Sequence, residues 1–299
     1  MVDAIVTVPP YAPFLKKVAR HGLVSGLRLN TVMPIKKTET LEEVIKRLQD
    51  IADGKDVWID LKGRQLRVVS YWAPPFTSIE LSHPITVNVP TTAYFSNGTD
   101  QATVVAIDGN KLITLEGPRR VVGPGESVNI IDSSLVIEGN LTDTDKAYIA
   151  AARNVKNSKY MMSFVESNAD LDDVKALDPA AELIAKIESR KGLQYVQKEA
   201  KGVRLMTARG DLYQEVPLPH DIIAASESII KKDKRAIMAS RLFASLSNSN
   251  YPSCEDIGDV DNVLRMGYRT LMLGDDVCMR EESVLSALNL LEAIAERYS

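Results

Sequence analysis

Two carboxylates and two cations lie at the ends of short apolar runs. Lys186 and Glu188 belong to ELIAKIE, Asp211 follows GVRLMTA, and Arg28 lies near the end of VSGLRLN. Carboxylate oxygens are the hard ligands that magnesium and manganese prefer. A metal and an ammonium group together can stabilise an enolate or a phosphoryl group as negative charge develops. We therefore expect Glu188 and Asp211 to share Mg2+ or Mn2+, with Lys186 and Arg28 facing an anionic substrate.

The segment TARGDLYQE, which begins at Thr207, has two interpretations. It is an ordinary polar turn, or it is a binding turn in which the amides of Gly210 and Asp211 open a short helix and receive a carboxylate or phosphate. Lys186 and Glu188 likewise have an ordinary interpretation, as an exposed pair worth at most about 1 kcal/mol. Their joint occurrence with TARGD favours a binding site.

Eight short apolar runs must position these residues. They are too continuous for half-exposed antiparallel strands and too short for helices, which is typical of buried parallel strands. Segments of helical period such as LEEVIKRLQDIA alternate with them. This alternation favours a (β/α)8 TIM barrel, an α/β fold. The runs begin at Ala4, Val24, Val57, Lys159, Glu182, Gly202, Arg235 and Thr270.

One interval interrupts the alternation. Between residues 68 and 139, turn signals such as Asp108-Gly109-Asn110 separate short β-rich runs. We predict a barrel over 1–67 and 140–299, with a small all-β domain over 68–139 inserted after strand three. In such barrels the insertions and the chemistry gather at the carboxyl ends of the strands. Six strand ends carry polar groups there: Arg28 and Asn30, Asp60 and Lys62, Ser163, Lys186 and Glu188, Arg209 and Asp211, and Ser240 and Arg241.

Composition limits the partners. The 299 residues carry a formal net charge of -4, so nothing indicates nucleic-acid binding. No run reaches the roughly 18 apolar residues of a membrane helix, and no export signal is visible. Two cysteines without a histidine cluster predict no zinc site and fit a reducing, cytoplasmic location.

A series of blocks resembles successive blocks of the pyruvate kinase family, in the family's order over nearly the whole chain. AKIES followed by TARGDL is the most specific of them. The resemblance implies a (β/α)8 barrel with a β-domain inserted after strand three. The other blocks are VPPYAPFLKKVARHGLVSGLRLN, VWIDLKGRQLR, MMSFVES with DLDDVKAL, IMASRLFASL and DIGDVDNVLRMGYRTLML.

The resemblance also implies roles for individual residues. Arg28 matches the arginine that contacts the transferred phosphoryl group, and Lys186 the lysine that stabilises the enolate of pyruvate. Glu188 and Asp211 match the magnesium ligands. The remaining matches are Asn30 and Asp60 as potassium ligands, Ala208, Arg209 and Gly210 as the turn that receives the substrate carboxylate, Ser163 at the edge of the site, Ser240 in place of a threonine near the methyl carbon, and Arg67 on the nucleotide side.

The sequence departs from the family mainly on the nucleotide side. Val32 and Met33 replace a serine and a histidine, and Gly274-Asp275-Asp276-Val277 replaces SGET. The lysine that precedes the family's GVNLPG has no counterpart here. The chain ends after the eighth helix, so we expect no carboxyl-terminal regulatory domain, and any homo-oligomer would use barrel surfaces.

Three functions are compatible with these residues. The first is phosphoryl transfer from phosphoenolpyruvate to a nucleoside diphosphate such as ADP, giving pyruvate, with Mg2+ and K+. The second is a metal-dependent lyase or decarboxylase that acts on a 2-oxo acid through the same enolpyruvate site. The third is a non-catalytic paralogue that binds a small anion or another protein.

Overall fold

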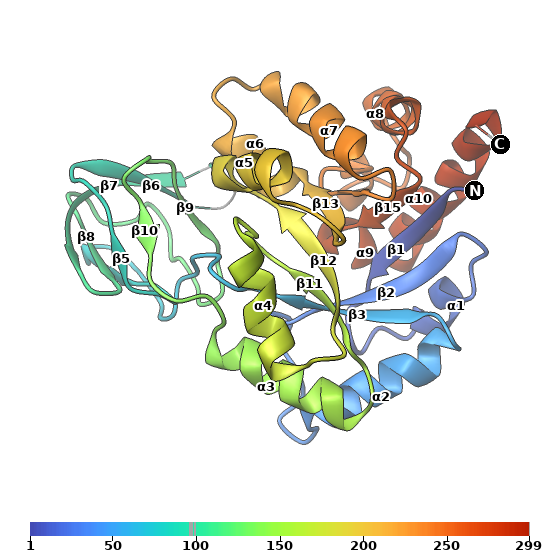
Figure 1. Ribbon diagram of the computed structural model, residues 1–299, viewed down its shortest axis with the longest axis horizontal. Helices are drawn as coiled ribbons and strands as arrows, with labels where there is room; N and C mark the ends of the chain where they lie inside the picture. The colour runs from blue at the N-terminus through green and yellow to red at the C-terminus, as the bar shows by residue number, and fades with distance from the viewer. Residues whose placement is uncertain (96–97, 99, 299) are drawn as a thin grey trace.

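The barrel is formed by parallel strands that alternate with helices. In a computed structural model that describes residues 1–95, 98 and 100–298, eight parallel strands close in the order β1-β15-β14-β13-β12-β11-β3-β2 (Figure 1). Each lies within two residues of its predicted limits, and the predicted TIM barrel is confirmed. The strands are β1 (Asp3–Thr7), β2 (Val24–Asn30), β3 (Asp56–Leu61), β11 (Lys159–Met162), β12 (Glu182–Ile187), β13 (Arg204–Ala208), β14 (Ile237–Ala239) and β15 (Thr270–Leu273).

The barrel interior is filled by large apolar side chains, so it is a packed core and no channel. Gly26 is the position of β2 that makes room for this packing. A Cβ atom there would lie 3.2 Å from both the Asp56 carbonyl oxygen and the Trp58 ring. The interior cluster consists of Ile5, Trp58, Met161, Ile184, Met206, Ile237, Ala239 and Met272.

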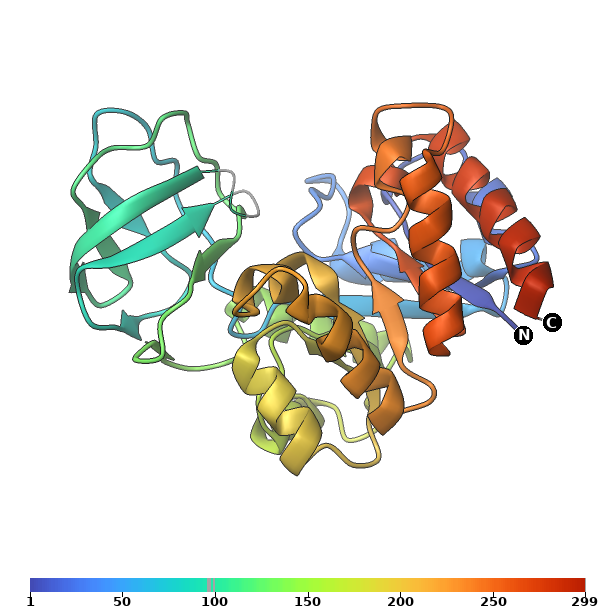
Figure 2. The ribbon, with the colours of Figure 1, turned by 90° about the horizontal axis from the view of Figure 1, so that it is seen from above.

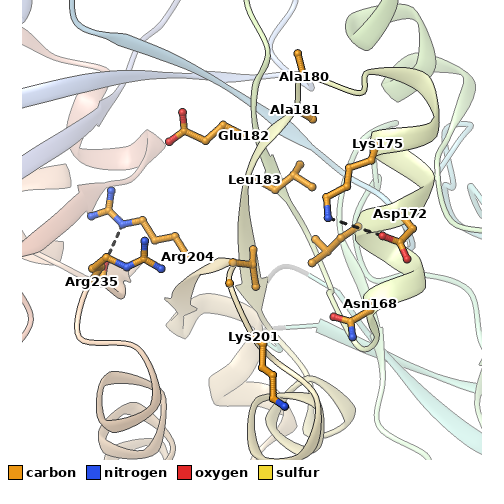
Figure 3. A pocket seen from close by; sticks show the side chains of 13 residues that line it. Asn168, Asp172, Lys175, Ala180, Ala181, Glu182, Leu183, Lys201, Arg204 and Arg235 are labelled. Atoms are coloured by element: carbon orange, nitrogen blue, oxygen red, sulfur yellow. Dashed lines mark hydrogen bonds and ion pairs between the residues drawn. The ribbon is translucent and has the colours of Figure 1, made fainter.

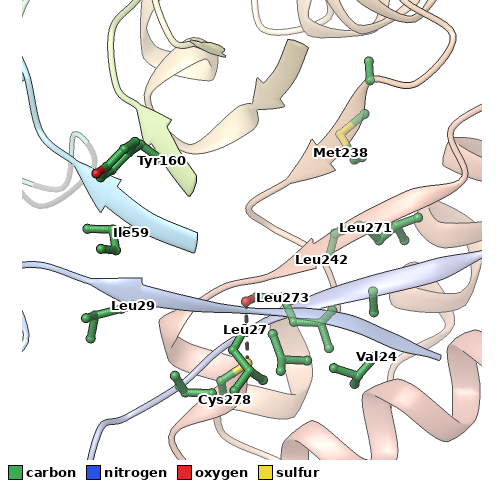
Figure 4. Close-up of a cluster of buried hydrophobic side chains, with 14 of the residues drawn as sticks. Val24, Leu27, Leu29, Ile59, Tyr160, Met238, Leu242, Leu271, Leu273 and Cys278 are labelled. Carbon is green, nitrogen blue, oxygen red and sulfur yellow. Dashed lines mark hydrogen bonds between the residues drawn. The ribbon is translucent and has the colours of Figure 1, made fainter. Parts of the chain in front are cut away.

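Helices cover the outside of the barrel and pack on the outward side chains of the strands. Figure 4 shows part of this layer, with Leu27, Leu29 and Leu271 among the buried side chains. The helix α2 coincides with the predicted segment LEEVIKRLQDIA. The α-helices of the described residues are α1 (Leu15–Ala19), α2 (Leu41–Ala52), α3 (Asp143–Asn154), α4 (Asn168–Leu177), α5 (Arg190–Lys198), α6 (Arg209–Glu215), α7 (Asp221–Lys232), α8 (Cys254–Met266), α9 (Asp275–Cys278) and α10 (Glu281–Ala295).

Several helices begin at the capping boxes that their sequences contain. Thr40 and Thr142 accept a hydrogen bond from the third helical residue, whose acidic side chain bonds back to the cap. In α3 that residue is Asp145, whose carboxylate also accepts hydrogen bonds from the backbone amides of Lys62 at 2.8 Å and Gly63 at 3.0 Å. The start of α3 therefore fixes the turn that follows β3, where candidate site residues lie.

The inserted segment forms a lobe of its own beside the barrel (Figures 1 and 2). Its described strands make a sheet in the order β4-β8-β7-β6-β9 and a pair β10-β5, around a separate apolar cluster that includes Trp72 and Phe95. The limits of this domain at 68 and 139 stay a prediction. The strands are β4 (Ser78–Glu80), β5 (Ile85–Thr86), β6 (Thr91–Phe95), β7 (Asp100–Asp108), β8 (Lys111–Thr114), β9 (Val128–Ile130) and β10 (Val136–Ile137).

No helix within the described part of the chain has the length and apolar character needed to cross a membrane.

Candidate active site

The candidate site lies one layer above the apolar barrel interior, because side chains alternate along a strand with a period of two. Two residues after interior Trp58 comes Asp60, and two residues after Ile184 comes Lys186. The same step leads from Gly26 to Arg28 and from Met161 to Ser163. The carboxyl ends of neighbouring strands therefore bring these polar side chains together on top of the core.

Asp60 is the centre of this layer. Its side chain is 0% exposed, and three cations contact its carboxylate. Arg28 donates to Oδ2 through Nε at 3.1 Å and also through Nη2. Lys62 Nζ lies 2.8 Å from Oδ2, and Lys186 Nζ lies 3.0 Å from Oδ1. One buried carboxylate thus balances part of the charge of three buried cations.

The protonation states of this cluster follow from burial and from the ion pairs. Burial alone would raise the pKa of Asp60, but Arg28 and the two ammonium groups outweigh it and hold that pKa well below its usual range. Burial lowers the pKa of Lys62 to about 7, although Asp60 opposes the change. Burial also opposes the charge of Lys186, yet Asp60 and Glu188 raise its pKa above the ordinary value. Lys186 is therefore a firmly charged ammonium group, whereas Lys62 titrates near neutrality.

Lys186 is held in one position by partners at the carboxyl ends of three strands. Besides Asp60 it donates to Ser163 Oγ at 2.7 Å and lies 3.3 Å from Glu188 Oε1. Glu188 in turn accepts the Phe164 amide at 2.9 Å. Such a preorganised ammonium group can stabilise negative charge that develops beside it.

Asp211 is held by the inserted domain as well as by the barrel. Asn129, on β9, donates to Oδ1 at 3.1 Å, and Gln65 donates to Oδ2 at 3.0 Å. Gln65 Oε1 also accepts a hydrogen bond from Arg67 Nη2 at 2.5 Å. Burial, with the Asp211 carboxylate adding to it, raises the pKa of Glu188 although Lys186 opposes the change. The two predicted metal ligands thus repel each other, and a cation bound near both would relieve this repulsion.

The rim beside Arg28 is formed by Asp275, at the start of α9. Arg28 Nη1 donates to Asp275 Oδ2 at 3.2 Å and to Thr7 Oγ1 at 2.9 Å. Asn30 Nδ2 lies 2.9 Å and 3.1 Å from the two Asp275 oxygens. Arg28 and Asn30 are therefore both engaged by one carboxylate that follows the last barrel strand.

Only part of the TARGD turn faces the cavity. Gly210 and Asp211 line the cavity described below, and a Cβ atom on Gly210 would lie 3.5 Å from Ser240 Oγ. The Arg209 side chain points away and forms a double hydrogen bond with Asp259 of α8, at 2.7 Å for each pair of atoms. Ser240 has a left-handed backbone with φ of 68°. Of the three turn residues Ala208, Arg209 and Gly210, only Gly210 therefore lines the cavity, and without a side chain it can offer a ligand only its backbone.

A cavity of about 610 Å³ opens over this constellation. Of the predicted site residues, Asp60 and Ser163 lie beneath its lining, and Ala208 and Arg209 lie outside it. The residues that line it are Arg28, Asn30, Lys62, Gln65, Arg67, Ser127, Lys186, Glu188, Gly210, Asp211, Ser240, Arg241, Leu242, Ala244, Ser247, Met272, Gly274, Asp275, Asp276 and Val277.

A larger cavity, of about 1010 Å³, lies at the opposite end of the strands (Figure 3). Glu182 and Arg204 begin β12 and β13 there, and an ion pair joins Lys175 to Asp172. Chemistry in (β/α)8 barrels lies at the carboxyl ends of the strands, and the amino ends serve stability. The smaller cavity is therefore the candidate active site.

The donor set near Glu188 and Asp211 fits magnesium. Among the described residues no group of three or more histidine, cysteine or acidic side chains could hold a metal. Mg2+ is nevertheless commonly bound through one or two carboxylates, with waters and substrate oxygens completing the shell. Potassium at Asn30 and Asp60 stays a prediction, and in this structure the Asp60 carboxylate already contacts three cations.

Sequence reasoning did not assign a site role to Lys62, Gln65, Asn129 or Asp275. Lys62 was visible as a polar residue at a strand end, and Asp275 as a departure from SGET. Asn129 lies in a strand of the inserted domain, where nothing in the local sequence points to the barrel.

Fold and site together define a (β/α)8 barrel protein with a charged cavity at the carboxyl ends of its strands. The family model "Pyruvate kinase, barrel domain" matches residues 78–280, more than half of the chain. The chain therefore belongs to the pyruvate kinase family.

Curated relatives agree with this assignment. The pyruvate kinase of Thermoplasma acidophilum is 23% identical across 93% of this chain and 54% of its own length. The pyruvate kinase of Methanocaldococcus jannaschii is 22% identical across 95% of this chain and 61% of its own length. Pyruvate kinase 2 of Synechocystis is 31% identical across 52% of this chain. The chain thus spans little more than half the length of the first two relatives.

Proposed function

We propose that this chain catalyses phosphoryl transfer between phosphoenolpyruvate and a nucleoside diphosphate such as ADP, through an enolate of pyruvate. The observation that carries the proposal is the buried ammonium group of Lys186, fixed by Asp60 and Ser163 beside Glu188. A fixed positive charge is what an enolate oxygen requires as it forms. The family relationship supports the same chemistry.

Each side chain has a separate task in this proposal. Lys186 stabilises the enolate oxygen, and Arg28 binds the phosphoryl group. Glu188 and Asp211 hold Mg2+, which supplies positive charge to the phosphoryl and enolate oxygens when bound. The backbone at Gly210 receives the substrate carboxylate, Ser240 lies near the methyl carbon, and Arg67 faces the nucleotide.

A second candidate is a metal-dependent lyase or decarboxylase that acts on a 2-oxo acid. Asp275 favours it, because its carboxylate already accepts a hydrogen bond from Arg28, the group that would bind a phosphoryl oxygen. The reaction would use Lys186, Glu188 and Asp211 in the same roles and would need no nucleotide.

Lys186→Met tests the part that both candidates share. We expect turnover to fall by about 10²–10³-fold, the usual cost of removing one preorganised electrostatic group. Mn2+ binding, measured by electron paramagnetic resonance, should be largely kept because both carboxylates remain. Lys201→Met is the matched control, since Lys201 is an exposed lysine in the cavity at the other end of the barrel.

The assays are pyruvate formation from phosphoenolpyruvate with several nucleoside diphosphates, and oxaloacetate decarboxylation, both with Mg2+ and K+. An unchanged rate in Lys186→Met would refute its role. Turnover of oxaloacetate without any nucleotide-dependent reaction would replace the first candidate by the second.

A further inference from the structure

Asp275 belongs to an ion-pair network that runs across the cavity. Asp275 contacts Arg28, Arg28 contacts Asp60, and Asp60 contacts both lysines. Lys186 then contacts Glu188. The network contains three cations, Arg28, Lys62 and Lys186, and three carboxylates, Asp60, Glu188 and Asp275, so its formal charge is zero.

The Asp275 carboxylate lies where an anionic ligand in the cavity would bind to Arg28 and Asn30. Its carboxylate accepts hydrogen bonds from Arg28 Nη1 at 3.2 Å and from Asn30 Nδ2 at 2.9 Å. Without it, and with Lys62 protonated, the network would hold three cations against two carboxylates, and an anionic ligand would restore the balance. Both oxygens of Asp275 face donors that a phosphate oxygen could use instead.

Asp275 also differs from Asp60 in its freedom to move. The Asp275 side chain is 35% exposed, and that of Asp60 is 0% exposed. It is the first residue of the four-residue α9, so it lies at an element end, where a side chain can leave its partners for solvent. Asp60 has no comparable path out of the core.

We propose that Asp275 is a specificity-determining residue that occupies the phosphoryl-binding side of Arg28 and Asn30, and must move aside before a phosphate-bearing ligand binds. The inference deepens the proposed function and rests on its assignment of Arg28 to the phosphoryl group. A ligand with carboxylate oxygens only, bound near Lys186 and the metal, does not displace Asp275. Binding of a phosphate-bearing ligand therefore includes the cost of displacing Asp275, which binding of a simple 2-oxo acid does not.

The test compares Asp275→Asn with the wild-type chain by calorimetry in the presence of Mg2+. The probes are phosphoenolpyruvate and inorganic phosphate, which need Arg28, and oxalate, which resembles an enolpyruvate without the phosphoryl group. We expect the variant to bind both phosphate probes about tenfold more tightly, a difference of about 1.4 kcal/mol. Oxalate affinity should change less than about twofold.

Asp276→Asn is the matched control, because it makes the same change in net charge at an exposed neighbour that lines the same cavity. Asp275→Ala is a second variant in case Asp275→Asn folds poorly, and the thermal midpoints of all variants are recorded.

Equal or weaker phosphate binding in both Asp275 variants would overturn the inference, as would an equal gain in Asp276→Asn. Failure of every protein to bind oxalate, together with a gain of phosphate affinity in Asp275→Asn alone, would contradict the enolpyruvate function and leave the role of Asp275 supported.

Discussion

Replacing Asp60 by asparagine should destabilise the barrel through the cations that it leaves behind. The substitution keeps the shape of a side chain that is 0% exposed but removes its charge. Arg28 would keep Asp275, and Lys186 would keep Glu188. Among the described residues, no second carboxylate lies within ion-pair distance of Lys62, so Lys62 is the cation that the loss of Asp60 affects most.

The size of the expected destabilisation follows from the loss of the partner of Lys62. Breaking a buried ion pair by removing one partner costs about 3–5 kcal/mol. Burial already lowers the pKa of Lys62 to about 7, so loss of a proton relieves part of the cost. We therefore expect the lower end, about 3 kcal/mol, or a fall in the unfolding midpoint of roughly 5 °C at pH 7.5.

The pH dependence has a definite sign. The unfolded chain keeps Lys62 protonated up to about pH 10.4, whereas the folded protein releases that proton above its lower folded pKa, so stability rises with pH between the two values. Losing Asp60 lowers the folded pKa of Lys62 further and extends this window below pH 7. The difference in stability between wild type and Asp60→Asn should therefore grow as pH falls from 7.5 to 6.

Thermal unfolding followed by circular dichroism measures these differences. Asp276→Asn serves as the control and should stay within about 0.5 kcal/mol of wild type. In the double variant Asp60→Asn/Lys62→Met, loss of the unpaired ammonium should restore part of the stability. Full stability in Asp60→Asn, or strictly additive effects in the double-mutant cycle, would refute the reasoning.

Two further predictions concern Asp211 and Glu215. Asn129→Ala frees Asp211 Oδ1 from its bond to the inserted domain, so we expect Mn2+ to bind severalfold more tightly by electron paramagnetic resonance; unchanged affinity would mean that the amide does not compete with the metal. Burial raises the pKa of Glu215 to about 7, so its contribution to stability is present below about pH 4.5 and is lost as pH rises through 7. Glu215→Gln should therefore gain about 1–2 kcal/mol relative to wild type between pH 5 and pH 8, and equal differences in unfolding midpoint at both pH values would contradict this.

The sequence predicted the fold well because strand burial is a local signal. Each of the eight barrel runs is continuous and apolar, and the period of two along a strand then places Arg28, Asp60 and Lys186 one layer above the core. The sequence also allowed us to predict that these residues converge, because the carboxyl ends of parallel strands lie on the same side of the barrel.

The rest of the site depends on directions and distant contacts that no local pattern encodes. Arg209 stands in the most specific motif, yet its side chain points to Asp259, 50 residues further along the chain. Asn129 reaches Asp211 from another domain, across 82 residues. Asp275 meets Arg28 across 247 residues, and only its departure from the family pattern marked it.

Burial divides the site into a fixed half and a movable half. Asp60 and Ser163 are 0% exposed, and they hold Lys186 against a packed core. Asp275 lies at the rim, and its side chain is 35% exposed. In the proposed function the enolate-stabilising half would serve phosphoryl transfer and decarboxylation equally, so it would not distinguish between them. The choice of reaction would then depend on the movable half, where we propose that Asp275 competes for Arg28.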